Sequence, residues 1–452
     1  MKTISIILAA GQGTRMRSNL PKVLHPLGGK PMVQYALRAV EGLSEETPIV
    51  VIGHGAEQVR QTVGEAARFA LQAERLGTGH AVLAAESLAA GQADLVLVTS
   101  ADMPLLRHET LRRLVETQSQ NPGPITMLTM TAEDSHGFGR IVRAPDGSVS
   151  AIVEEAECTP QQLAIREYNV GAYCFRVDWL WPALHRVPLS PKGEYYVTDT
   201  VGMAVSEGLP VLALTISDND EALGINTRVH LAEAEAVLRR RINTEWMLAG
   251  VTLVDPASTY IGPDVQIGQD TVVQPNTFLR GKTVIGSGCV IGPNSILEDA
   301  TVGNDCKVLA SVLEKAVLED HVEMGPFCRL RKGAHLASHV HMGNFGEVKD
   351  SYLGPGTKMG HFSYIGNATI GQNVNIGAGT ITCNYDGVHK HPTEIGDEVF
   401  IGSDTMLVAP VKIGDRSRSG AGAVITRDVP EDTLVAGVPA RVLRKLKEKD
   451  GE

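Results

Sequence analysis

Residues 261–292 read IGPDVQIGQDTVVQPNTFLRGKTVIGSGCVIG, and an isoleucine followed by glycine returns there at spacings of six residues or a multiple of six. A small residue (Val, Ala, Thr or Ser) often follows four positions after the aliphatic one. The aliphatic-glycine pair returns at Met324-Gly325, Met359-Gly360, Ile365-Gly366, Ile376-Gly377, Ile395-Gly396, Ile401-Gly402 and Ile413-Gly414. A hexapeptide repeat is typical of a parallel β-helix, in which each aliphatic side chain points inward and stacks on its copy one coil away. We predict a left-handed parallel β-helix over residues 250–452, with glycine permitting the sharp turns where a Cβ would clash.

The repeat is interrupted between Thr382 and Thr393, where Cys383-Asn384-Tyr385-Asp386-Gly387 does not follow it. A segment that breaks the repeat has no place in the stacked coils, so we expect it to leave them as a loop. Loops carried by rigid scaffolds often hold binding or catalytic residues. This segment is therefore a candidate functional region.

The residues before the repeat follow another pattern, in which short apolar runs alternate with longer amphipathic segments. The runs are Ile4–Ala9, Ile49–Ile52, Leu95–Thr99, Ile125–Met130 and Val211–Leu214. Continuous apolar strands separated by helical segments indicate a mostly parallel sheet covered on both faces. Ligands of such sheets bind beyond the carboxyl ends of the strands. We expect an α/β, Rossmann-like domain over residues 1–228.

A long amphipathic helix is expected between the two patterns, over residues 229–249, as a linker. The apolar residues that return every three or four positions are Leu231, Ala234, Leu238, Ile242 and Trp246. This spacing places them on one helix face. The intervening Arg239-Arg240-Arg241 is interpreted as a solvated face rather than a phosphate site.

The composition excludes several classes of protein. The 452 residues include 47 Gly, 6 Cys and 4% aromatic residues, and the formal net charge is −11. No basic arm stands out, so nucleic acid is not an expected partner. The cysteines have neither CxxC nor Cys/His spacing, which indicates free thiols in a reducing compartment. No apolar run approaches the ~20 residues of a membrane span, and we expect a cytoplasmic protein without membrane insertion.

A glycine-rich segment, Leu8-Ala9-Ala10-Gly11-Gln12-Gly13-Thr14-Arg15-Met16, follows the first apolar run. Glycines let backbone N–H groups approach a phosphate closely, and Arg15 and Lys22 add positive charge. The segment is neither a Walker loop nor a complete GxGxxG motif, so a glycine turn with two surface cations stays open. Asp102 comes soon after the apolar run that ends at Thr99, which makes it a candidate Mg²⁺ ligand or a cap of the next helix.

Together with Pro21-Lys22, this segment resembles the signature of the sugar nucleotidyltransferases. Segments that agree with that family are Leu76-Gly77-Thr78-Gly79 after Gln72, Ser100-Ala101-Asp102-Met103-Pro104, Gly137-Phe138-Gly139-Arg140-Ile141, Gly193-Glu194-Tyr195-Tyr196 and Gly224-Ile225-Asn226. Combined with the repeat, nearly the whole chain resembles the bifunctional N-acetylglucosamine-1-phosphate uridyltransferase/glucosamine-1-phosphate acetyltransferases of bacterial cell-wall synthesis. The resemblance implies acetyl transfer from acetyl-CoA to glucosamine-1-phosphate. It also implies uridylyl transfer from UTP to the product, N-acetylglucosamine-1-phosphate, which gives UDP-N-acetylglucosamine and pyrophosphate.

The resemblance also implies a set of ligands for the first domain. The residues matched to UTP or UDP-N-acetylglucosamine are Leu8, Ala9, Ala10, Gly11, Arg15, Lys22, Gln72, Gly77, Thr78, Gly139, Glu154, Asn169 and Asn226. Within this set, the uracil is assigned to Gln72 and Gly77-Thr78, the sugar to Gly139, Glu154 and Asn169, and Mg²⁺ to Asp102 and Asn226. In the family a glycine usually precedes the metal-binding aspartate, whereas Ala101 stands here. One added methyl group leaves Mg²⁺ binding as expected, while the sugar contacts near Ser100 stay open.

In the repeat domain, Met359-Gly360-His361-Phe362-Ser363-Tyr364 resembles the catalytic turn of the family. Acetyl transfer to an amine needs a base, and imidazole, with an unperturbed pKa of ~6.5, suits that role. We therefore expect His361 to be the base. The residues matched to glucosamine-1-phosphate are Arg331, Lys349, Tyr364, Asn375 and Lys390, with Glu347 ordering them; those matched to acetyl-CoA are Ala378, Asn384, Tyr385, Ser403 and Ala421. The backbone N–H of Ala378 would donate to the thioester oxyanion.

The C-terminal segment departs from the family. Ala436-Gly437-Val438-Pro439-Ala440-Arg441 is the ending of the wider hexapeptide acyltransferases, so the usual CoA-contacting arginine is missing at position 437. We expect Arg441 or the basic tail to contact the CoA phosphates instead, with a solvated tail helix as the alternative. The basic residues of the tail are Arg444, Lys445, Lys447 and Lys449.

β-Helix prisms of this kind resemble trimers with acyl sites between neighbouring subunits, so a homotrimer is expected. Two other readings stay open. The chain could be a nucleotidyltransferase alone, with the β-helix as an oligomerisation or regulatory module, as in ADP-glucose and GDP-mannose pyrophosphorylases. The β-helix could also be a scaffold or binding module without a ligand. His361 and the Asn384-Tyr385 loop argue against the first of these, and stabilisation by acetyl-CoA would exclude the second. We assign uridylyl transfer to residues 1–228 and acetyl transfer to residues 250–452.

Overall fold

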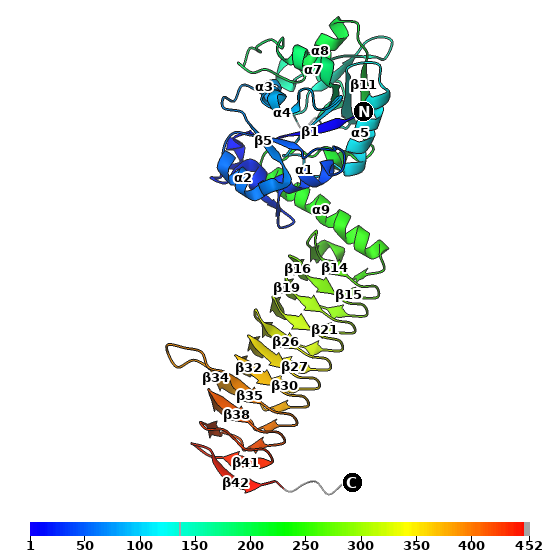
Figure 1. The fold of residues 1–452 in the computed structure, drawn as a ribbon. Helices are drawn as coiled ribbons and strands as arrows, with labels where there is room; N and C mark the ends of the chain where they lie inside the picture. The colour runs from blue at the N-terminus through cyan, green and yellow to red at the C-terminus, as the bar shows by residue number, and fades with distance from the viewer. Residues whose placement is uncertain (135–136, 447–452) are drawn as a thin grey trace. The chain divides into compact units, whose positions relative to one another are not determined.

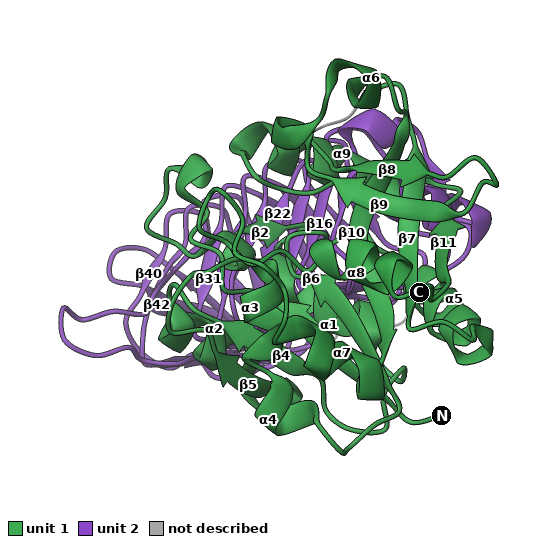
Figure 2. Cartoon of the chain, turned by 90° about the horizontal axis from the view of Figure 1, so that it is seen from above, with its two compact units in different colours: residues 1–238 green, residues 239–452 purple. Residues whose placement is uncertain are grey.

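The computed structural model describes residues 1–134 and 137–446. The chain forms two compact units, Met1–Leu238 and Arg239–Glu452, and their boundary falls inside helix α9 (Arg228–Leu248) (Figures 1 and 2). Within the described ranges, no helix has the length and apolarity that a bilayer crossing requires.

The first unit is built on a mixed sheet whose main strands follow the order β11-β7-β10-β6-β1-β4-β5 (Figure 1). The strands are β1 (Thr3–Leu8), β4 (Ile49–Ile52), β5 (Arg68–Leu71), β6 (Leu95–Ser100), β7 (Ile125–Thr131), β10 (Glu167–Arg176) and β11 (Val211–Thr215). The five apolar runs of the sequence are all strands, and β1 pairs in parallel with β4 and β6. The predicted α/β, mostly parallel architecture is confirmed.

Helices cover both faces of this sheet, which explains why its strands are apolar throughout. Successive residues of β1 alternate between two cores: Ile7 packs with α1 (Met32–Val40) and α5 (His108–Gln120). Ile6 packs on the other face with α7 (Val177–Leu184) and α8 (Asp199–Ser206). A strand buried on both faces leaves polar residues only at its ends, where a ligand can reach them.

Strand β10 was not anticipated from the sequence. It runs antiparallel between β6 and β7 in the centre of the sheet. Its pairing with β7 shifts register between Asn169 and Tyr173, next to Gly171, whose φ is +84°. The hairpin of β8 (Arg140–Arg143) and β9 (Val149–Val153) is attached to β10. Polar residues and a glycine interrupt the apolar run of β10, so its sequence lacks the pattern that marks the other strands.

The second unit is a left-handed parallel β-helix, as predicted. Its strands form sheets of 12, 10 and 9 members, and up to β37 (Met406–Val408) each strand pairs with the third strand that follows it. One inward-facing ladder runs through Ile267, Ile285, Val302, Leu318 and Leu336. The side chains of this ladder are nearly completely buried. Stacked aliphatic ladders of this kind form the core, and the sheets turn their polar residues outward.

Most glycines that follow the aliphatic residues have a different role from the one predicted, whereas Gly292 and Gly325 do have a positive φ, of +96° and +105°. Gly268, Gly286 and Gly303 do not adopt the left-handed conformation, which occurs two residues later, at Asp270 with a φ of +61° and Asp305 with a φ of +54°. A Cβ on Gly286 would lie 2.6 Å from the carbonyl oxygen of Gly303 on the next coil. These glycines therefore allow neighbouring coils to approach, and Asp or Asn, which tolerate the left-handed region, make the turn.

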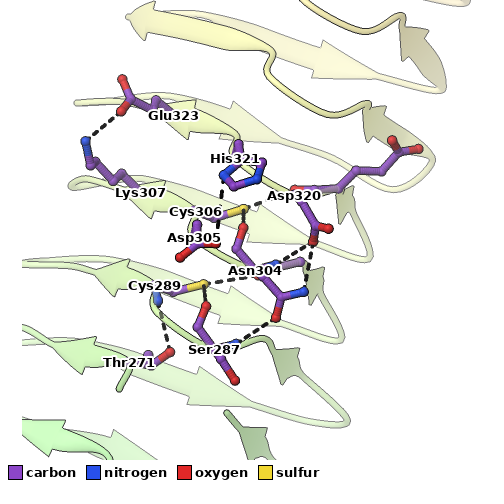
Figure 3. A network of polar contacts seen from close by, with 12 residues as sticks. Thr271, Ser287, Cys289, Asn304, Asp305, Cys306, Lys307, Asp320, His321 and Glu323 are labelled. Atoms are coloured by element: carbon purple, nitrogen blue, oxygen red, sulfur yellow. Dashed lines mark hydrogen bonds and ion pairs between the residues drawn. The ribbon is translucent and has the colours of Figure 1, made fainter. Parts of the chain in front are cut away.

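Polar corner side chains tie successive coils together (Figure 3). The backbone N–H of Ser287 donates to Asn304 Oδ1 at 3.0 Å, and that of Asn304 donates to Asp320 Oδ1 at 2.7 Å. The thiols of Cys289 and Cys306 donate to backbone carbonyl oxygens in the same network. Each corner thus satisfies the N–H groups of the coil before it, which the short strands leave unpaired.

The predicted loop is confirmed between β34 (Ile381–Cys383) and β35 (Thr393–Ile395), and it projects from the coils (Figure 1). The final strand β42 (Arg441–Lys445) runs antiparallel to β41 (Thr433–Ala436). The tail-helix alternative is therefore wrong for these residues, because backbone pairing with β41 extends the chain. Lys447 and Lys449 lie outside the described residues.

Candidate active sites

The first candidate site is a cavity of about 760 Å³ in the first unit, beyond the carboxyl ends of β1 and β6. The predicted ligand residues that line it are Leu8, Ala9, Ala10, Gly11, Lys22, Gln72, Gly77, Thr78, Asp102, Gly139, Glu154 and Asn169. Residues that were not predicted also line it, among them Gln12, Arg75, Ser100, Glu194, Tyr196 and Thr198. Segments that are far apart in the sequence thus surround one volume, which is large enough for a small organic ligand.

The cationic side chain of Lys22 lies between two oxygens at this cavity. Its ammonium nitrogen is 2.5 Å from Asp102 Oδ2 and donates to Asn226 Oδ1 at 2.7 Å. Ser100 Oγ donates to the other Asp102 oxygen at 2.6 Å. Burial raises the pKa of Asp102, but the charge of Lys22 and the hydrogen bonds from Lys22 and Ser100 outweigh it, and the pKa is lowered. Asp102 is therefore ionised at neutral pH.

The same two oxygens fit a divalent cation. Asp102 and Asn226 are far apart in the sequence, yet both direct an oxygen at one positive charge, the Lys22 ammonium. Mg²⁺ prefers carboxylate and carbonyl oxygens and seldom sits in a cage made by protein alone. Two protein oxygens leave the remaining positions to phosphates and water, so this donor set suits an ion that arrives with a nucleotide.

Two glycines shape the backbone beside Lys22 and Gln72, which line the cavity. Gly13 has a φ of +63°, and a Cβ there would lie 2.5 Å from the Lys22 Cβ. Gly77 has a φ of +96°, and a Cβ there would lie 2.5 Å from the carbonyl oxygen of Tyr195. Both positions therefore need glycine for conformation and for space. Gln72 stabilises the segment that contains Gly77, because its side-chain amide donates to the Gly77 carbonyl oxygen at 3.0 Å.

Glu154 and Asn169 also line the cavity. Thr198 Oγ1 donates to Glu154 Oε1 at 3.2 Å. Burial raises the pKa of Glu154 more than this hydrogen bond lowers it. Asn169 donates to the Tyr173 hydroxyl at 2.6 Å and accepts from the Gly171 N–H at 3.1 Å, within the irregular part of β10. This wall presents acceptors that suit the hydroxyl and amide groups of a sugar.

Arg15 and Asn226 are the predicted ligand residues that do not line the cavity. Arg15 is exposed in the short helix η1 (Thr14–Met16). Asn226 reaches the cavity indirectly, through its hydrogen bond from Lys22. The prediction that Arg15 binds phosphate therefore needs either a ligand that extends past the described lining or a change of its rotamer.

The second candidate site follows one column of the β-helix, at a corner of successive coils. His361 ends β30 (Lys358–His361) and stands in register with Asn344, which ends β27 (His341–Asn344). The next positions of the column are Ala378, Ser403 and Ala421. The carbonyl oxygen of His361 accepts from Gly379 N–H, that of Ala378 from Asp404 N–H, and that of Ser403 from Gly422 N–H. The predicted base and three predicted acetyl-CoA residues thus lie on adjacent coils.

The imidazole of His361 is exposed and held by one side chain. Its Nδ1 is 2.8 Å from the amide oxygen of Asn344. Because an amide oxygen only accepts, Nδ1 carries the proton and Nε2 is left as the basic atom. The backbone N–H of Ala378, one coil further, donates to no acceptor within residues 1–134 and 137–446. A free base and a free donor on neighbouring coils are the two groups that acyl transfer to an amine requires.

Cationic side chains gather on the 10-stranded sheet. Arg331 and Lys349, which ends β28 (Glu347–Lys349), occupy equivalent positions on successive coils. Arg331 Nη1 donates to Glu347 Oε1 at 3.0 Å. Lys349 also lies 3.6 Å from Asp350 Oδ2, and its interaction with Lys390 of the projecting loop raises the pKa of Lys349 and lowers that of Lys390. Three basic side chains with two carboxylates suit an anionic ligand such as a sugar phosphate.

The side chains of Tyr364 and Asn384 both lie close to Gly366. A Cβ on Gly366 would lie 2.5 Å from the Tyr364 hydroxyl and 2.9 Å from the side-chain nitrogen of Asn384. Asn384 in turn donates to Asn367 Oδ1 at 2.7 Å. A predicted sugar residue and a predicted acetyl-CoA residue are thus in one cluster.

Other elements carry Asn375 and Arg441, and Tyr385 follows Asn384 in the projecting loop. Asn375 begins β33 (Asn375–Ile376) in the 12-stranded sheet, whereas Tyr364 belongs to β31 (Tyr364–Gly366) in the 10-stranded sheet. Tyr385 is 61% exposed in the projecting loop, and Arg441 lies in the terminal strand β42. One chain therefore does not bring all the predicted acyl-transfer residues together.

Among the residues missed from the sequence at these sites, Asn344 and Arg75 stand out for their contacts. Asn344 lies one coil before His361, so the coil spacing itself could have identified it. Arg75 lines the first cavity but belongs to no recognised motif. Its position follows only from the fold.

The comparisons with known proteins agree with this arrangement. The model of the MobA-like NTP transferase domain matches residues 5–186, and that of the hexapeptide repeat of succinyl-transferase matches residues 282–312 and 392–427. The Bifunctional protein GlmU of Heliobacterium modesticaldum is 47% identical over 99% of this chain and 97% of its own length. The proteins of the same name from Pelobacter propionicus and Shouchella clausii are 46% and 44% identical, and the matches cover 98% and 95% of this chain and 97% and 95% of those proteins. The chain therefore belongs to the family of the bifunctional GlmU proteins.

Proposed function

We propose that this chain catalyses two successive transfers, acetylation of glucosamine-1-phosphate by acetyl-CoA and uridylyl transfer from UTP to the N-acetylglucosamine-1-phosphate so formed. The observation that carries the proposal is the presence of two chemically different sites in two units. One is a cavity with a carboxylate, an amide and a cation; the other is a base beside a free N–H donor. Membership of the GlmU family supports the pairing of these activities.

In uridylyl transfer, a phosphate oxygen of the sugar phosphate forms a bond to the α-phosphorus of UTP, and the bond to pyrophosphate breaks. Such a reaction needs alignment and charge neutralisation rather than a covalent intermediate. The glycine-rich segment and Lys22 bind the phosphates, and Gln72 with Gly77-Thr78 binds the uracil. Glu154 and Asn169 accept from and donate to the sugar.

Mg²⁺ held by Asp102 and Asn226 would supply neutralisation of the phosphate charge and fix the phosphate geometry. The contribution of the chain itself is to orient those two oxygens, through Ser100 on one side of Asp102 and Lys22 on the other. Lys22 then exchanges part of its contact with Asp102 for phosphate oxygens. A lysine that is already at the cavity needs little reorganisation to do so.

In acetyl transfer, the amine nitrogen of glucosamine-1-phosphate attacks the carbonyl carbon of the thioester, and Nε2 of His361 takes a proton from that nitrogen. The Ala378 N–H donates to the oxyanion that forms. When the tetrahedral intermediate collapses, the carbon–sulfur bond breaks and the sulfur leaves with a proton as CoA. Arg331, Lys349 and Lys390 hold the phosphate of the acceptor.

We also propose that the acetyl-transfer site is completed by a neighbouring subunit of a homotrimer. Asn375 supports this proposal, because it belongs to a different sheet from Tyr364 and Lys349. Two neighbouring β-helices facing each other would supply both sheets to one site. Arg441 or the basic residues after it then serve the CoA phosphates of such a shared site.

The experiment that tests the function supplies the protein with glucosamine-1-phosphate, acetyl-CoA, UTP and Mg²⁺, and quantifies CoA, pyrophosphate and UDP-N-acetylglucosamine. All three products are expected. When acetyl-CoA is omitted, no UDP-N-acetylglucosamine should form, and adding N-acetylglucosamine-1-phosphate should restore it. If UDP-sugar forms from N-acetylglucosamine-1-phosphate but CoA is never released, the β-helix is a module without acetyltransferase activity.

Replacement of Asn344 by leucine is expected to lower kcat of acetyl transfer about tenfold, with little change in KM for acetyl-CoA, because Nδ1 loses its acceptor and the tautomer with a basic Nε2 is no longer selected. Asn344→Asp restores an acceptor and, because a carboxylate stabilises imidazolium, moves the acid limb of the pH–rate profile to higher pH. A purely structural role for Asn344 would lower activity without moving that limb. Uridylyl transfer by the same preparations serves as the internal control.

A further inference from the structure

The cations that line the nucleotide cavity differ in how they are neutralised. Two are present in its walls, Lys22 and Arg75. Lys22 is already engaged by Asp102 at 2.5 Å and by Asn226 at 2.7 Å. Arg75 is exposed, and within residues 1–134 and 137–446 it has no carboxylate partner. Its guanidinium donates only to the side-chain amide oxygen of Gln12.

The Arg75–Gln12 hydrogen bond joins two segments that serve different parts of a nucleotide. Arg75 lies in the segment between β5 and α3 (Thr78–Leu83), which also carries Gln72 and Gly77. Gln12 belongs to the glycine-rich segment, between Gly11 and Gly13. Gly11 is exposed, and apart from its chain neighbours no heavy atom lies within 4 Å of a Cβ built on it. The guanidinium is therefore held beside the glycine-rich segment, whose backbone at Gly11 is open.

The charges of the cavity walls also favour a ligand-binding role for Arg75. Three carboxyl groups line the cavity, those of Asp102, Glu154 and Glu194, against the two cations. Without Arg75, a polyanionic ligand would meet three carboxyl groups and only one ammonium group, itself in contact with Asp102. A guanidinium has paired N–H donors that match the geometry of a phosphate. It binds an anion more strongly than it binds a neutral amide oxygen.

We propose that Arg75 is a phosphate-binding residue for the nucleoside triphosphate, and that Gln12 holds its guanidinium in place until the nucleotide arrives. On binding, the guanidinium exchanges the amide oxygen of Gln12 for phosphate oxygens, so that the base-binding and phosphate-binding segments close on the same ligand. The inference rests on the proposed uridylyl transfer and adds a residue to it. It makes Arg75 a second phosphate cation beside Lys22.

The test compares Arg75→Gln with the matched control Arg112→Gln, an exposed arginine of α5 that pairs with Glu109 and Glu116 away from the cavity. Arg75→Gln is expected to raise KM for UTP about tenfold with kcat within twofold, because one charge-assisted contact is lost. The dissociation constant for uridine, which has no phosphate, should not change. The control should match the wild-type protein in both measurements, and thermal unfolding of each variant establishes that it is folded.

Arg75→Lys separates phosphate binding from a structural bridge. If Arg75 binds phosphate, lysine keeps the positive charge but loses the paired donors, so KM for UTP should lie between the values of the wild-type protein and Arg75→Gln. Equal weakening of UTP binding by Arg75→Lys and Arg75→Gln would overturn the inference, and so would a KM for UTP in Arg75→Gln within twofold of the wild-type value. A wild-type protein that binds no UTP would instead overturn the proposed uridylyl transfer itself, which distinguishes the two failures.

Discussion

Replacing Asp102 with alanine is expected to lower the rate of UDP-N-acetylglucosamine formation by about 10²–10³-fold and to leave acetyl transfer within twofold of the wild-type rate. The variant removes the Asp102 carboxylate and leaves only the amide oxygen of Asn226. Lys22 thereby loses the partner that lies 2.5 Å from its ammonium nitrogen. Mg²⁺ with its phosphates then loses its carboxylate ligand. Release of pyrophosphate and release of CoA, measured on one preparation, report the two activities separately.

Asp102→Asn is the matched control for this prediction. It keeps an oxygen near Ser100 and Lys22 but removes the charge, so its activity should fall between those of the alanine variant and the wild-type protein. Because the pKa of Asp102 lies below its usual range, the carboxylate stays charged as the pH falls toward mildly acidic values. Loss of uridylyl transfer between pH 7 and pH 6 should therefore not arise from Asp102. Wild-type uridylyl activity in Asp102→Ala would contradict the metal assignment.

Replacing His361 with alanine is expected to lower the rate of acetyl transfer by about 10²–10⁴-fold, the usual contribution of a positioned base, without affecting uridylyl transfer. The side chain is exposed and, among the residues that the structure describes, makes one hydrogen bond, to Asn344, so its removal should leave the stacked coils intact. CoA release in the presence of glucosamine-1-phosphate measures the loss. Retention of wild-type acetyl transfer would show that another group removes the proton.

A mixture of two inactive variants, one of them His361→Ala, tests whether neighbouring subunits share the acetyl-transfer site. His361→Ala subunits and Asn375→Ala subunits, refolded or expressed together, can form interfaces in which each defect lies on the other side. If neighbouring subunits share a site, part of the activity returns in the mixture. If each chain forms its own complete site, the mixture stays as inactive as its components.

The fold was largely predictable because both of its patterns are periodic. Parallel strands buried on two faces are continuous apolar runs, and the sequence of the second unit repeats a hexapeptide pattern. Strand β10 escaped prediction since Asn169 and Gly171 interrupt its apolar run, and its central place is set by pairing with β6 and β7. The role of the corner glycines was also misjudged, because contact with the next coil is a property of the stack.

The candidate sites were predictable where a motif carries the chemistry. The glycine-rich segment, Asp102 and His361 belong to such motifs, and their matched partners gather in one cavity or one column. Asn344 and Arg75 do not, because each makes its hydrogen bond to a residue that only folding brings near. The charge balance of the cavity could not be predicted from the sequence either, because the ion pair of Lys22 with Asp102 joins residues far apart in the chain.

The reversed strand β42 limits how far the stack of coils can grow. A parallel β-helix ends in a row of unpaired backbone groups, and an open row of this kind can nucleate fibres by recruiting another chain. Here β42 is the edge strand of the 12-stranded sheet, runs against the direction of its neighbour and is exposed along its whole length. It also carries Arg441, Arg444 and Lys445, so two such ends repel each other. Polymerisation through this edge is therefore blocked by both polarity and charge.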